Sequence, residues 1–253
     1  MGPYCTIGAN VVLGEGCVLV SHVVLDGHLT MGANNGIFPF ACLGMAPQDL
    51  KYKGEATALR IGRRNVFREF VTINRGTAGG GGETTIGNDN LFMAYVHVAH
   101  DCHVGSGTIF GPHATLGGHV GVEDFANISA GSAVHQFCRV GRYGFIGGYS
   151  VVTKDALPFG RTIGSRPARV FGVNSIGLSR RGFTVDTIGQ LKLAYRYLLQ
   201  SKLNTTQALQ QIEQDESLSA PEVRYLVEFI RTSQRGVILR RPTRRAEELV
   251  ADE

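Results

Sequence analysis

The sequence predicts a mainly β fold, a parallel β-helix of six-residue repeats followed by a small α-helical C-terminal domain. Three observations support this prediction: large apolar residues recur at every sixth position, glycine is abundant, and the repeat stops near Val152. The chain has 253 residues, of which 34 are glycine and 8 are proline. The glycines are spread along the first two thirds of the chain, which indicates many tight turns rather than one flexible linker.

The six-residue period is clearest over residues 86–152, where every sixth residue is large and apolar. The series is Ile86, Phe92, Val98, Val104, Phe110, Leu116, Val122, Ile128, Val134, Val140, Ile146 and Val152. Neither a helix of 3.6 residues per turn nor simple strand alternation has this period. We therefore expect a triangular coil in which three hexads close a turn of about 18 residues, with coils stacked about 4.8 Å apart.

Small residues fill other positions of the hexad. Glycine often follows the large residue directly, as at Gly87 and Gly117, and a small residue such as Cys102 often comes four positions after it. We expect the large residue to point inward and the glycine or the small residue to permit the corner.

Two segments interrupt the repeat, residues 46–58 and 76–85, and we expect both to project from the prism as loops. The second segment is rich in glycine but lacks the Lys-Ser/Thr ending of a phosphate-binding loop, so we interpret it as a plain flexible loop. The β-helix is thus expected over residues 1–155, a C-terminal helical domain over 156–239 and a mobile charged tail over 240–253.

Helical spacing replaces the hexad in the C-terminal region. Apolar residues including Leu191 and Tyr195 predict a helix over residues 185–200. The string Ser219–Glu222 has the pattern of a capping box and predicts a later helix, which we expect to end at Gly236.

Composition excludes several classes of protein. No apolar run approaches ~18 residues, so we expect no transmembrane helix, and we expect no signal peptide at the start. The five cysteines form no close Cys-x-x-Cys pair, which favours reduced thiols in the cytoplasm. The net charge is +4, and residues 153–239 hold the excess, with 12 Lys and Arg against 7 Asp and Glu. This basic segment fits an acidic protein, a phosphate group, nucleic acid or a solvated helical surface.

Histidines gather on successive hexads of the expected coil. A count of about 18 residues per turn places Gly118 above His100, His119 above Asp101, and His135 one coil further along the same edge. Imidazole accepts a proton near neutral pH, and the backbone N–H of a glycine can face a developing oxyanion. The arrangement therefore indicates acyl transfer to a hydroxyl group by general-base catalysis.

Two other interpretations compete with catalysis. The spacing His97-x-x-His100-x-x-His103 offers imidazole ligands, and trimeric β-helices of the gamma carbonic anhydrase type bind zinc through histidines of two subunits. The separated histidine spacing of that family is not reproduced here, so we expect no metal. A noncatalytic scaffold with the same prism is the second alternative.

Five strings of this sequence are specific beyond the repeat: His97–Cys102, Gly117–His119, Ala133–Phe137, Gln48–Tyr52 and Gly177–Phe183. They closely resemble strings of the acyl carrier protein-dependent UDP-N-acetylglucosamine O-acyltransferases that begin lipid A synthesis. The resemblance runs from residue 2 to residue 238, and these strings are more specific than the hexapeptide repeat, which many acyltransferases share. It implies a left-handed parallel β-helix and a homotrimer with active sites between neighbouring prisms.

The resemblance also implies roles for individual residues. His100 would deprotonate the glucosamine 3-hydroxyl, Gly118 would donate to the oxyanion, and Asp101 would support the base. The residues implied to hold the sugar nucleotide or the acyl chain are Asp49, Lys51, His97, His119, His135 and Gln136. Asn174, Arg180 and Arg181 would contact the nucleotide and the carrier protein, and Gly148 would form the floor of the acyl groove and limit chain length.

The implied partners are acyl carrier protein, UDP-N-acetylglucosamine and two further copies of the chain, without a cofactor, nucleic acid or stable membrane insertion. Some members of the family acylate a 3-amino sugar instead, which remains an alternative. The segment Arg161–Phe171 and Ile176 depart from the family pattern, and both departures concern the contacts with the nucleotide.

Overall fold

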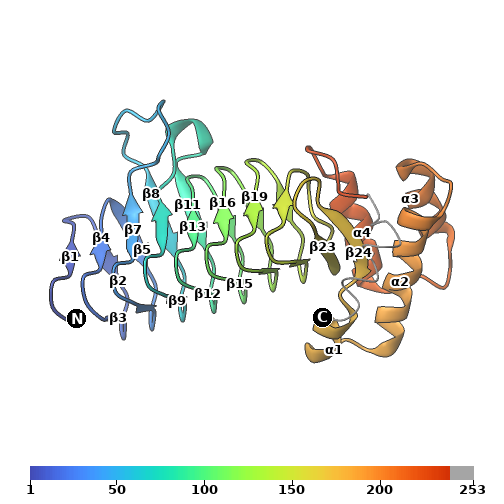
Figure 1. Ribbon diagram of the computed structural model, residues 1–253, viewed down its shortest axis with the longest axis horizontal. Coiled ribbons are helices and arrows are strands. Elements are labelled where there is room, and N and C mark those ends of the chain that lie inside the picture. The colour runs from blue at the N-terminus through green and yellow to red at the C-terminus, as the bar shows by residue number, and fades with distance from the viewer. Residues whose placement is uncertain (240–253) are drawn as a thin grey trace.

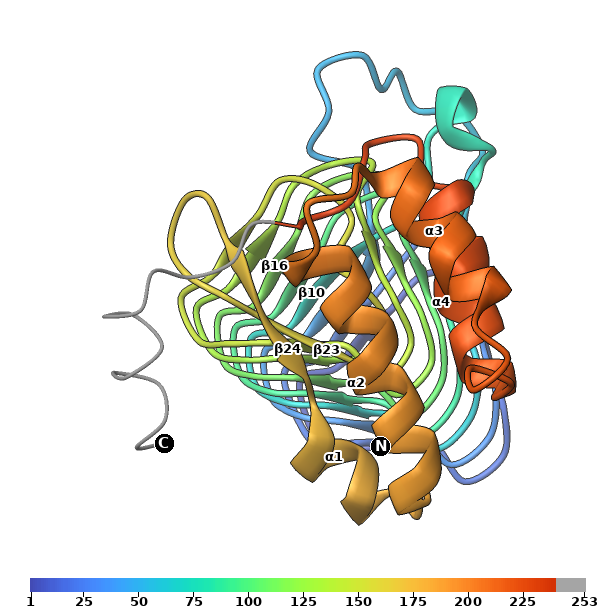
Figure 2. The same cartoon turned by 90° about the vertical axis from the view of Figure 1, so that its right-hand side faces the viewer.

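The computed structural model describes residues 1–239, which form three long sheets wound into a prism with helices at one end (Figure 1). The expected tail, residues 240–253, lies outside the described residues. Seen along its axis, the prism has a triangular outline (Figure 2).

Each sheet takes one strand from every coil, so neighbouring strands come from successive turns. The first sheet contains β1 (Thr6–Ile7), β4 (Val24–Leu25), β7 (Cys42–Met45), β10 (Thr72–Asn74), β13 (His97–Val98), β16 (Thr115–Leu116), β19 (Ala133–Val134) and β22 (Val151–Val152). The second contains β2 (Val12–Leu13), β5 (His28–Met31), β8 (Ala58–Ile61), β11 (Glu83–Ile86), β14 (His103–Val104), β17 (Gly121–Val122) and β20 (Arg139–Val140). The third contains β3 (Val18–Leu19), β6 (Gly36–Ile37), β9 (Val66–Phe67), β12 (Leu91–Phe92), β15 (Ile109–Phe110), β18 (Asn127–Ile128), β21 (Phe145–Ile146), β23 (Gly160–Ile163) and β24 (Arg169–Val173).

The large residue of each hexad points into the prism, as the period predicts. Phe67, Phe92 and Phe110 are fully buried and stack on one another, with ring centroids 5.0 and 4.8 Å apart. Such offset stacking adds to the free energy gained from burying the rings.

Buried amides add a polar ladder at one corner of the core. Asn35 Oδ1 accepts from the backbone N–H of Asn65 at 2.8 Å, Asn65 Oδ1 accepts from that of Asn90 at 2.9 Å, and Asn90 Oδ1 accepts from that of Thr108 at 2.7 Å. Each side chain thus satisfies a backbone donor of the next coil, which a buried polar group requires.

The expectation that glycine permits the corner is wrong for most hexads. The corner residue with positive φ comes three positions after the large residue and is often aromatic or acidic, as at Tyr95 (φ 63°) and Asp101 (φ 58°). Glycine after the large residue serves a different purpose: a Cβ on Gly87 or Gly111 would lie 2.5 Å from the backbone of the next coil. These glycines therefore allow the coils to stack closely.

The three edges of the prism are named here after one residue each. The His100 corner (residues 99–102 and 117–120) joins the first sheet to the second, the Phe125 corner (residues 105–108 and 123–126) joins the second to the third, and the Tyr149 corner (residues 111–114 and 147–150) joins the third to the first.

Two loops project from the His100 corner (Figure 1). The first lies between Met45 of β7 and Ala58 of β8. The second lies between β10 and β11 and contains the 3-10 helix η1 (Ala78–Gly80). Both loops replace an ordinary corner between the first and second sheets, so they lie on the edge that carries His100.

The C-terminal region begins with β structure rather than with a helix. β23 pairs with β21 in parallel, and β24 returns antiparallel to β23. Four helices follow within the described residues: α1 (Ser175–Arg180), α2 (Val185–Gln200), α3 (Thr205–Gln214) and α4 (Pro221–Arg231). We propose to place the boundary between β-helix and C-terminal domain after residue 155, where the repeat ends.

α2 lies across the end of the prism, where the buried Tyr195 hydroxyl donates to the Pro158 carbonyl at 2.6 Å (Figure 2). The helix predicted over residues 185–200 is confirmed. The capping-box prediction is wrong: Ala220 is the N-cap of α4 and makes no side-chain cap bond, and the helix ends at Arg231, before Gly236. Proline at the first helical position has no N–H, so one of the backbone donors that a side-chain cap would satisfy is absent.

No helix among residues 1–239 is long and apolar enough to cross a membrane.

Candidate active site

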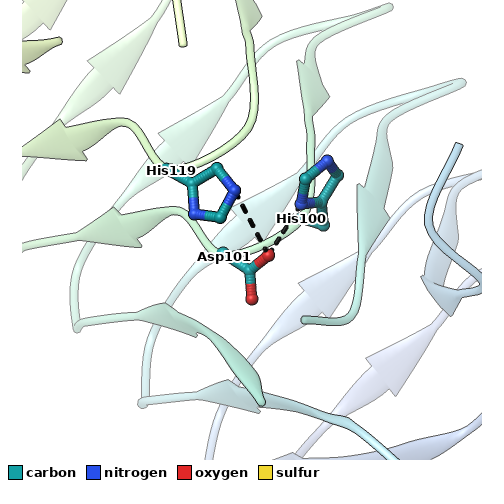
Figure 3. A group of neighbouring side chains, drawn as sticks. All are labelled: His100, Asp101 and His119. Carbon is teal, nitrogen blue, oxygen red and sulfur yellow. Dashed lines mark hydrogen bonds and ion pairs between the residues drawn. The ribbon is translucent and has the colours of Figure 1, made fainter. Parts of the chain in front are cut away.

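A histidine–aspartate pair lies at the centre of the His100 corner (Figure 3). His100 Nδ1 lies 2.7 Å from Asp101 Oδ2, and His119 Nε2 from the next coil lies 3.8 Å from the same oxygen. The two imidazole rings meet edge to face, with centroids 5.2 Å apart. The Nδ1 of His100 is therefore occupied by the carboxylate, which leaves its Nε2 as the reactive nitrogen.

Asp101 is held from several sides. Its carboxylate accepts hydrogen bonds from the Thr77 backbone N–H at 2.8 Å and the Thr77 hydroxyl at 2.6 Å, and its own N–H donates to the Thr84 hydroxyl at 2.8 Å. Burial alone would raise the pKa of Asp101, but the hydrogen bonds from Thr77 and His100 outweigh it and hold that pKa below its usual value. Asp101 is thus a fixed anion at neutral pH.

The glycine-rich segment covers this carboxylate, so the interpretation of it as a plain flexible loop is wrong. Thr77 lies at its start and is the N-cap residue of η1. A Cβ on Gly80 would collide with the Asp101 carboxylate, whereas one on Gly79 would meet nothing within 4 Å. Thr77, Thr84 and Gly80 were missed in the sequence because the loop interrupts the count of 18 residues per coil.

Gly118 lies directly over the His100 ring, as the coil count predicts. A Cβ at this position would be 2.6 Å from His100 Cε1 and 2.8 Å from Nε2. Its carbonyl accepts from Phe137 N at 3.1 Å, while its own N–H donates to no group among the described residues. A substrate oxygen near His100 Nε2 would find this N–H unoccupied.

Two further histidines line the same corner. His97 Nδ1 lies 2.8 Å from the Thr72 hydroxyl of the preceding coil, and His119 stacks on Phe137 with centroids 4.3 Å apart. Burial, and then the neighbouring His100, lower the pKa of His97. Burial also lowers the pKa of His119, against the carboxylates of Asp101 and Asp49. Both rings are therefore predominantly neutral near pH 7.

The remaining predicted residues of this corner are more exposed. His135 and Gln136 come from the next coil, where His135 Nδ1 lies 3.1 Å from the Gln136 carbonyl. Asp49 and Lys51 lie in the first projecting loop, where Asp49 Oδ1 accepts from the Lys51 backbone N–H at 2.9 Å.

Arg75 holds this loop in place by donating to the Gly44 carbonyl at 2.8 Å and to the Tyr52 hydroxyl at 3.1 Å.

Four predicted residues lie on other edges of the same chain. Asn174 caps α1, and Arg181 lies 4.9 Å above the Phe125 ring; together with Arg180 they line a pocket at the Phe125 corner. Gly148 lies exposed at the Tyr149 corner, where an added Cβ would meet only the Ala130 carbonyl oxygen, at 3.5 Å. One chain thus brings none of the four to His100.

The histidine spacing considered for zinc does not form a ligand set. Among residues 1–239, the one group of three potential metal ligands is His100, Asp101 and His119, and His97 and His103 are not part of it.

Comparisons with known proteins agree with one another. A family model described as UDP N-acetylglucosamine O-acyltransferase, domain 2, matches residues 155–238, and one described as bacterial transferase hexapeptide (six repeats) matches residues 83–118. A relative from Thermodesulfovibrio yellowstonii, named acyl-[acyl-carrier-protein]–UDP-N-acetylglucosamine O-acyltransferase, is 48% identical over 237 residues, which cover 94% of this chain and 91% of the relative.

Solved structures give the same result. LpxA from Acinetobacter baumannii superposes with a TM-score of 0.90 at 41% identity, covering 93% of this chain and 91% of that one. The Arabidopsis UDP-N-acetylglucosamine acyltransferase superposes with a TM-score of 0.84 at 36% identity, covering 94% and 92%. The predicted fold, a left-handed parallel β-helix of hexapeptide repeats followed by a small α-helical domain, is confirmed.

Proposed function

Since the chain belongs to the family of acyl-[acyl-carrier-protein]–UDP-N-acetylglucosamine O-acyltransferases, we propose that it transfers a 3-hydroxyacyl group from acyl carrier protein to the 3-hydroxyl of UDP-N-acetylglucosamine. This would be the first step of lipid A biosynthesis. The observation that supports the proposal best is the His100–Asp101 pair at 2.7 Å beneath the unoccupied N–H of Gly118.

The reaction begins with proton transfer to His100. The Nδ1–H donates to Asp101, so the lone pair of Nε2 accepts the proton of the sugar 3-hydroxyl as its oxygen attacks the thioester carbonyl carbon. Asp101 fixes this tautomer and stabilises the imidazolium that forms, in the manner of the carboxylate of a hydrolase triad.

The tetrahedral intermediate carries its negative charge on the former carbonyl oxygen. The Gly118 N–H donates to this oxyanion. Collapse of the intermediate breaks the carbon–sulfur bond, and the departing thiolate takes the proton from the His100 imidazolium. The products are the acylated sugar nucleotide and the free thiol of the carrier protein, so His100 returns to its neutral state.

The residues proposed to hold the acceptor and the donor around this centre are Asp49, Lys51, His97, His119, His135 and Gln136. His97 and His119 are suited to the uncharged sugar, because burial keeps them predominantly neutral. Lys51 provides a positive charge in the projecting loop for a diphosphate.

Asn174, Arg180 and Arg181 are proposed to bind the nucleotide and the acidic carrier protein, and Gly148 is proposed to limit the acyl chain. These residues lie at corners other than that of His100. A homotrimer in which the His100 corner faces the Phe125 corner of a neighbouring prism would bring Asn174, Arg180 and Arg181 of that neighbour to the base. We therefore propose a trimer with active sites between chains, located in the cytoplasm with its soluble substrates.

Mass spectrometry of the product tests the function. Purified protein is incubated with UDP-N-acetylglucosamine and 3-hydroxyacyl carrier proteins of graded chain length. The expected product carries one 3-hydroxyacyl group in an ester that mild base hydrolyses. Absence of this ester with every donor, or an amide resistant to mild base, would contradict the proposal.

A further inference from the structure

One buried amide in the protein has an unsatisfied oxygen. Asn74, at the end of β10, is 3% exposed, and its Nδ2 donates to the Ala46 carbonyl at 3.1 Å. Its Oδ1 has no hydrogen-bond partner among the described residues. A buried carbonyl oxygen without a donor is costly and uncommon, so this atom indicates a donor that comes from outside the chain.

The unpaired atom is the oxygen rather than the nitrogen. If the amide were turned over, Oδ1 would face the Ala46 carbonyl oxygen, and two acceptors would oppose each other. The buried asparagines inside the prism differ from Asn74, because the oxygens of Asn35, Asn65 and Asn90 all accept hydrogen bonds.

Strand register places Asn74 beside the catalytic corner. Thr72 pairs with His97 and Ile73 pairs with Val98, so Asn74 lies beneath Ala99, the residue before His100. Ile73 is fully buried in the core, so alternation along the strand turns Asn74 to the outer surface of the first sheet, the side of His97.

Small residues follow Asn74 along the outer surface of the first sheet. The next residues along the prism are Ala99 and then Gly117, because Val98 pairs with Leu116. Both side chains are small, and the projecting loop that begins at Ala46 borders the same place. A sugar whose hydroxyl group reaches His100 Nε2 would therefore lie close to Asn74.

We propose that Asn74 is a specificity-determining residue whose Oδ1 accepts a hydrogen bond from a hydroxyl group of the acceptor sugar, other than the hydroxyl that is acylated. This inference rests on the proposed function. An uncharged acceptor with no internal partner favours a ligand that brings an O–H donor and rejects one in which that donor is missing.

The test couples a protein variant with altered sugars. Asn74→Leu keeps the size of the side chain and removes the acceptor. We expect the KM for UDP-N-acetylglucosamine to rise about three- to tenfold, the factor for one neutral hydrogen bond, with the KM for the acyl donor unchanged. The 4-deoxy and 6-deoxy sugar nucleotides are then tested with both proteins. For the wild type, one of the two should have a KM higher than that of UDP-N-acetylglucosamine by a similar factor. For Asn74→Leu, the same deoxy sugar and UDP-N-acetylglucosamine should have equal KM values, because the acceptor of that hydroxyl group is already absent.

Thr162→Val is the matched control, because Thr162 Oγ1 is also buried and unpaired but lies in β23. It should change neither KM. If Asn74→Leu does not fold, Asn74→Ala replaces it in the same comparison of protein variant and deoxy sugar. The effect of the variant and the effect of the deoxy sugar on KM could instead simply add for both sugars. This result would overturn the assignment of Asn74 and leave the proposed function intact. If the wild type acylates no UDP-N-acetylglucosamine, both the proposed function and the role of Asn74 are contradicted.

Discussion

The carboxylate of Asp101 links two functions at the scale of a single residue. It fixes the His100 tautomer through Oδ2, and it receives the glycine-rich loop through the two donors of Thr77. Since the same oxygen serves His100 and the Thr77 hydroxyl, the position of the base depends on the loop. A substitution in the loop should therefore change the turnover rate.

His100→Ala should lower kcat by about 10²–10⁴, the usual range for a lost general base. The protein should remain folded, because the side chain projects from the corner and contributes little to the core. His113→Ala is the matched control: His113 is also a corner histidine, but it lies at the Tyr149 corner. Steady-state rates at saturating substrates measure the effect. Near-native turnover of His100→Ala would exclude it as the base.

Thr77→Val should make stability depend less on pH. The pKa of Asp101 lies below its value in the unfolded chain, so its hydrogen bonds stabilise the fold above about pH 4 and cease to do so as the pH falls through the folded pKa. We expect the variant to lose about 1.5–3 kcal/mol at pH 7 for a bond to a charged group, and less at pH 3, which lies below the pKa of the unfolded chain. Denaturant unfolding at the two pH values provides the measurement.

An equal loss at both pH values would show that Thr77 acts through packing rather than through the carboxylate. Thr85→Val is a suitable comparison, because the Thr85 hydroxyl pairs with His103 on an exposed face.

At the scale of elements, η1 acts as a cover over the buried carboxylate. Gly80→Ala should force the loop or Asp101 to move, at a cost of about 1–3 kcal/mol, and should lower kcat as His100 loses its support. Gly79→Ala, one position earlier in the same element, places its Cβ in open space and should leave both unchanged. Thermal unfolding and turnover distinguish the pair. Similar behaviour of the two variants would indicate that the cover is not closely packed.

The coil could be predicted from the sequence because its period is independent of the loops. Phe92 and Phe110 lie one turn apart in the sequence and stack in the core, and the same count places Gly118 over His100. The contact of Thr77 with Asp101 could not be predicted, because an insertion with no period of its own fixes no register. The position of the corner residue was also missed, because a positive φ at Tyr95 or Asp101 does not change the spacing of the apolar residues.

At the scale of the whole molecule, the predicted site residues fall on separate edges of one chain. The base lies at the His100 corner, the arginines at the Phe125 corner and Gly148 at the Tyr149 corner. If neighbouring chains complete each site, two variants that are inactive alone should restore activity when they are mixed.

Coexpression of His100→Ala with Arg180→Glu/Arg181→Glu tests this arrangement. Random mixed trimers should contain intact sites at about a quarter of their interfaces, because each site needs an unaltered corner from each of two chains. Turnover of the mixture should then clearly exceed that of either variant. Activity no higher than the average of the separate variants would mean that each chain contains its own site.

Gly148→Met should shift the preference towards shorter acyl donors. A Cβ added at Gly148 meets only the Ala130 carbonyl oxygen, and the residue is exposed, so the fold should tolerate the change. Overpacking of the groove costs about 1–3 kcal/mol, or roughly one to two decades in relative rate for long donors. Competition between donors of graded length measures the shift. An unchanged length profile would limit Gly148 to the role of a corner residue.

The asparagine ladder bears on how a repetitive chain avoids incorrect threading. Hexads resemble one another, so a turn that slips by six residues still buries an apolar core and competes with the native arrangement. The ladder makes such a slip unfavourable, because Asn90 would then face Ala114 instead of Thr108 and its Oδ1 would lose the hydrogen bond from the Thr108 hydroxyl. As a single polar residue specifies the pairing of a coiled coil, a few buried amides distinguish the native winding from its near-copies.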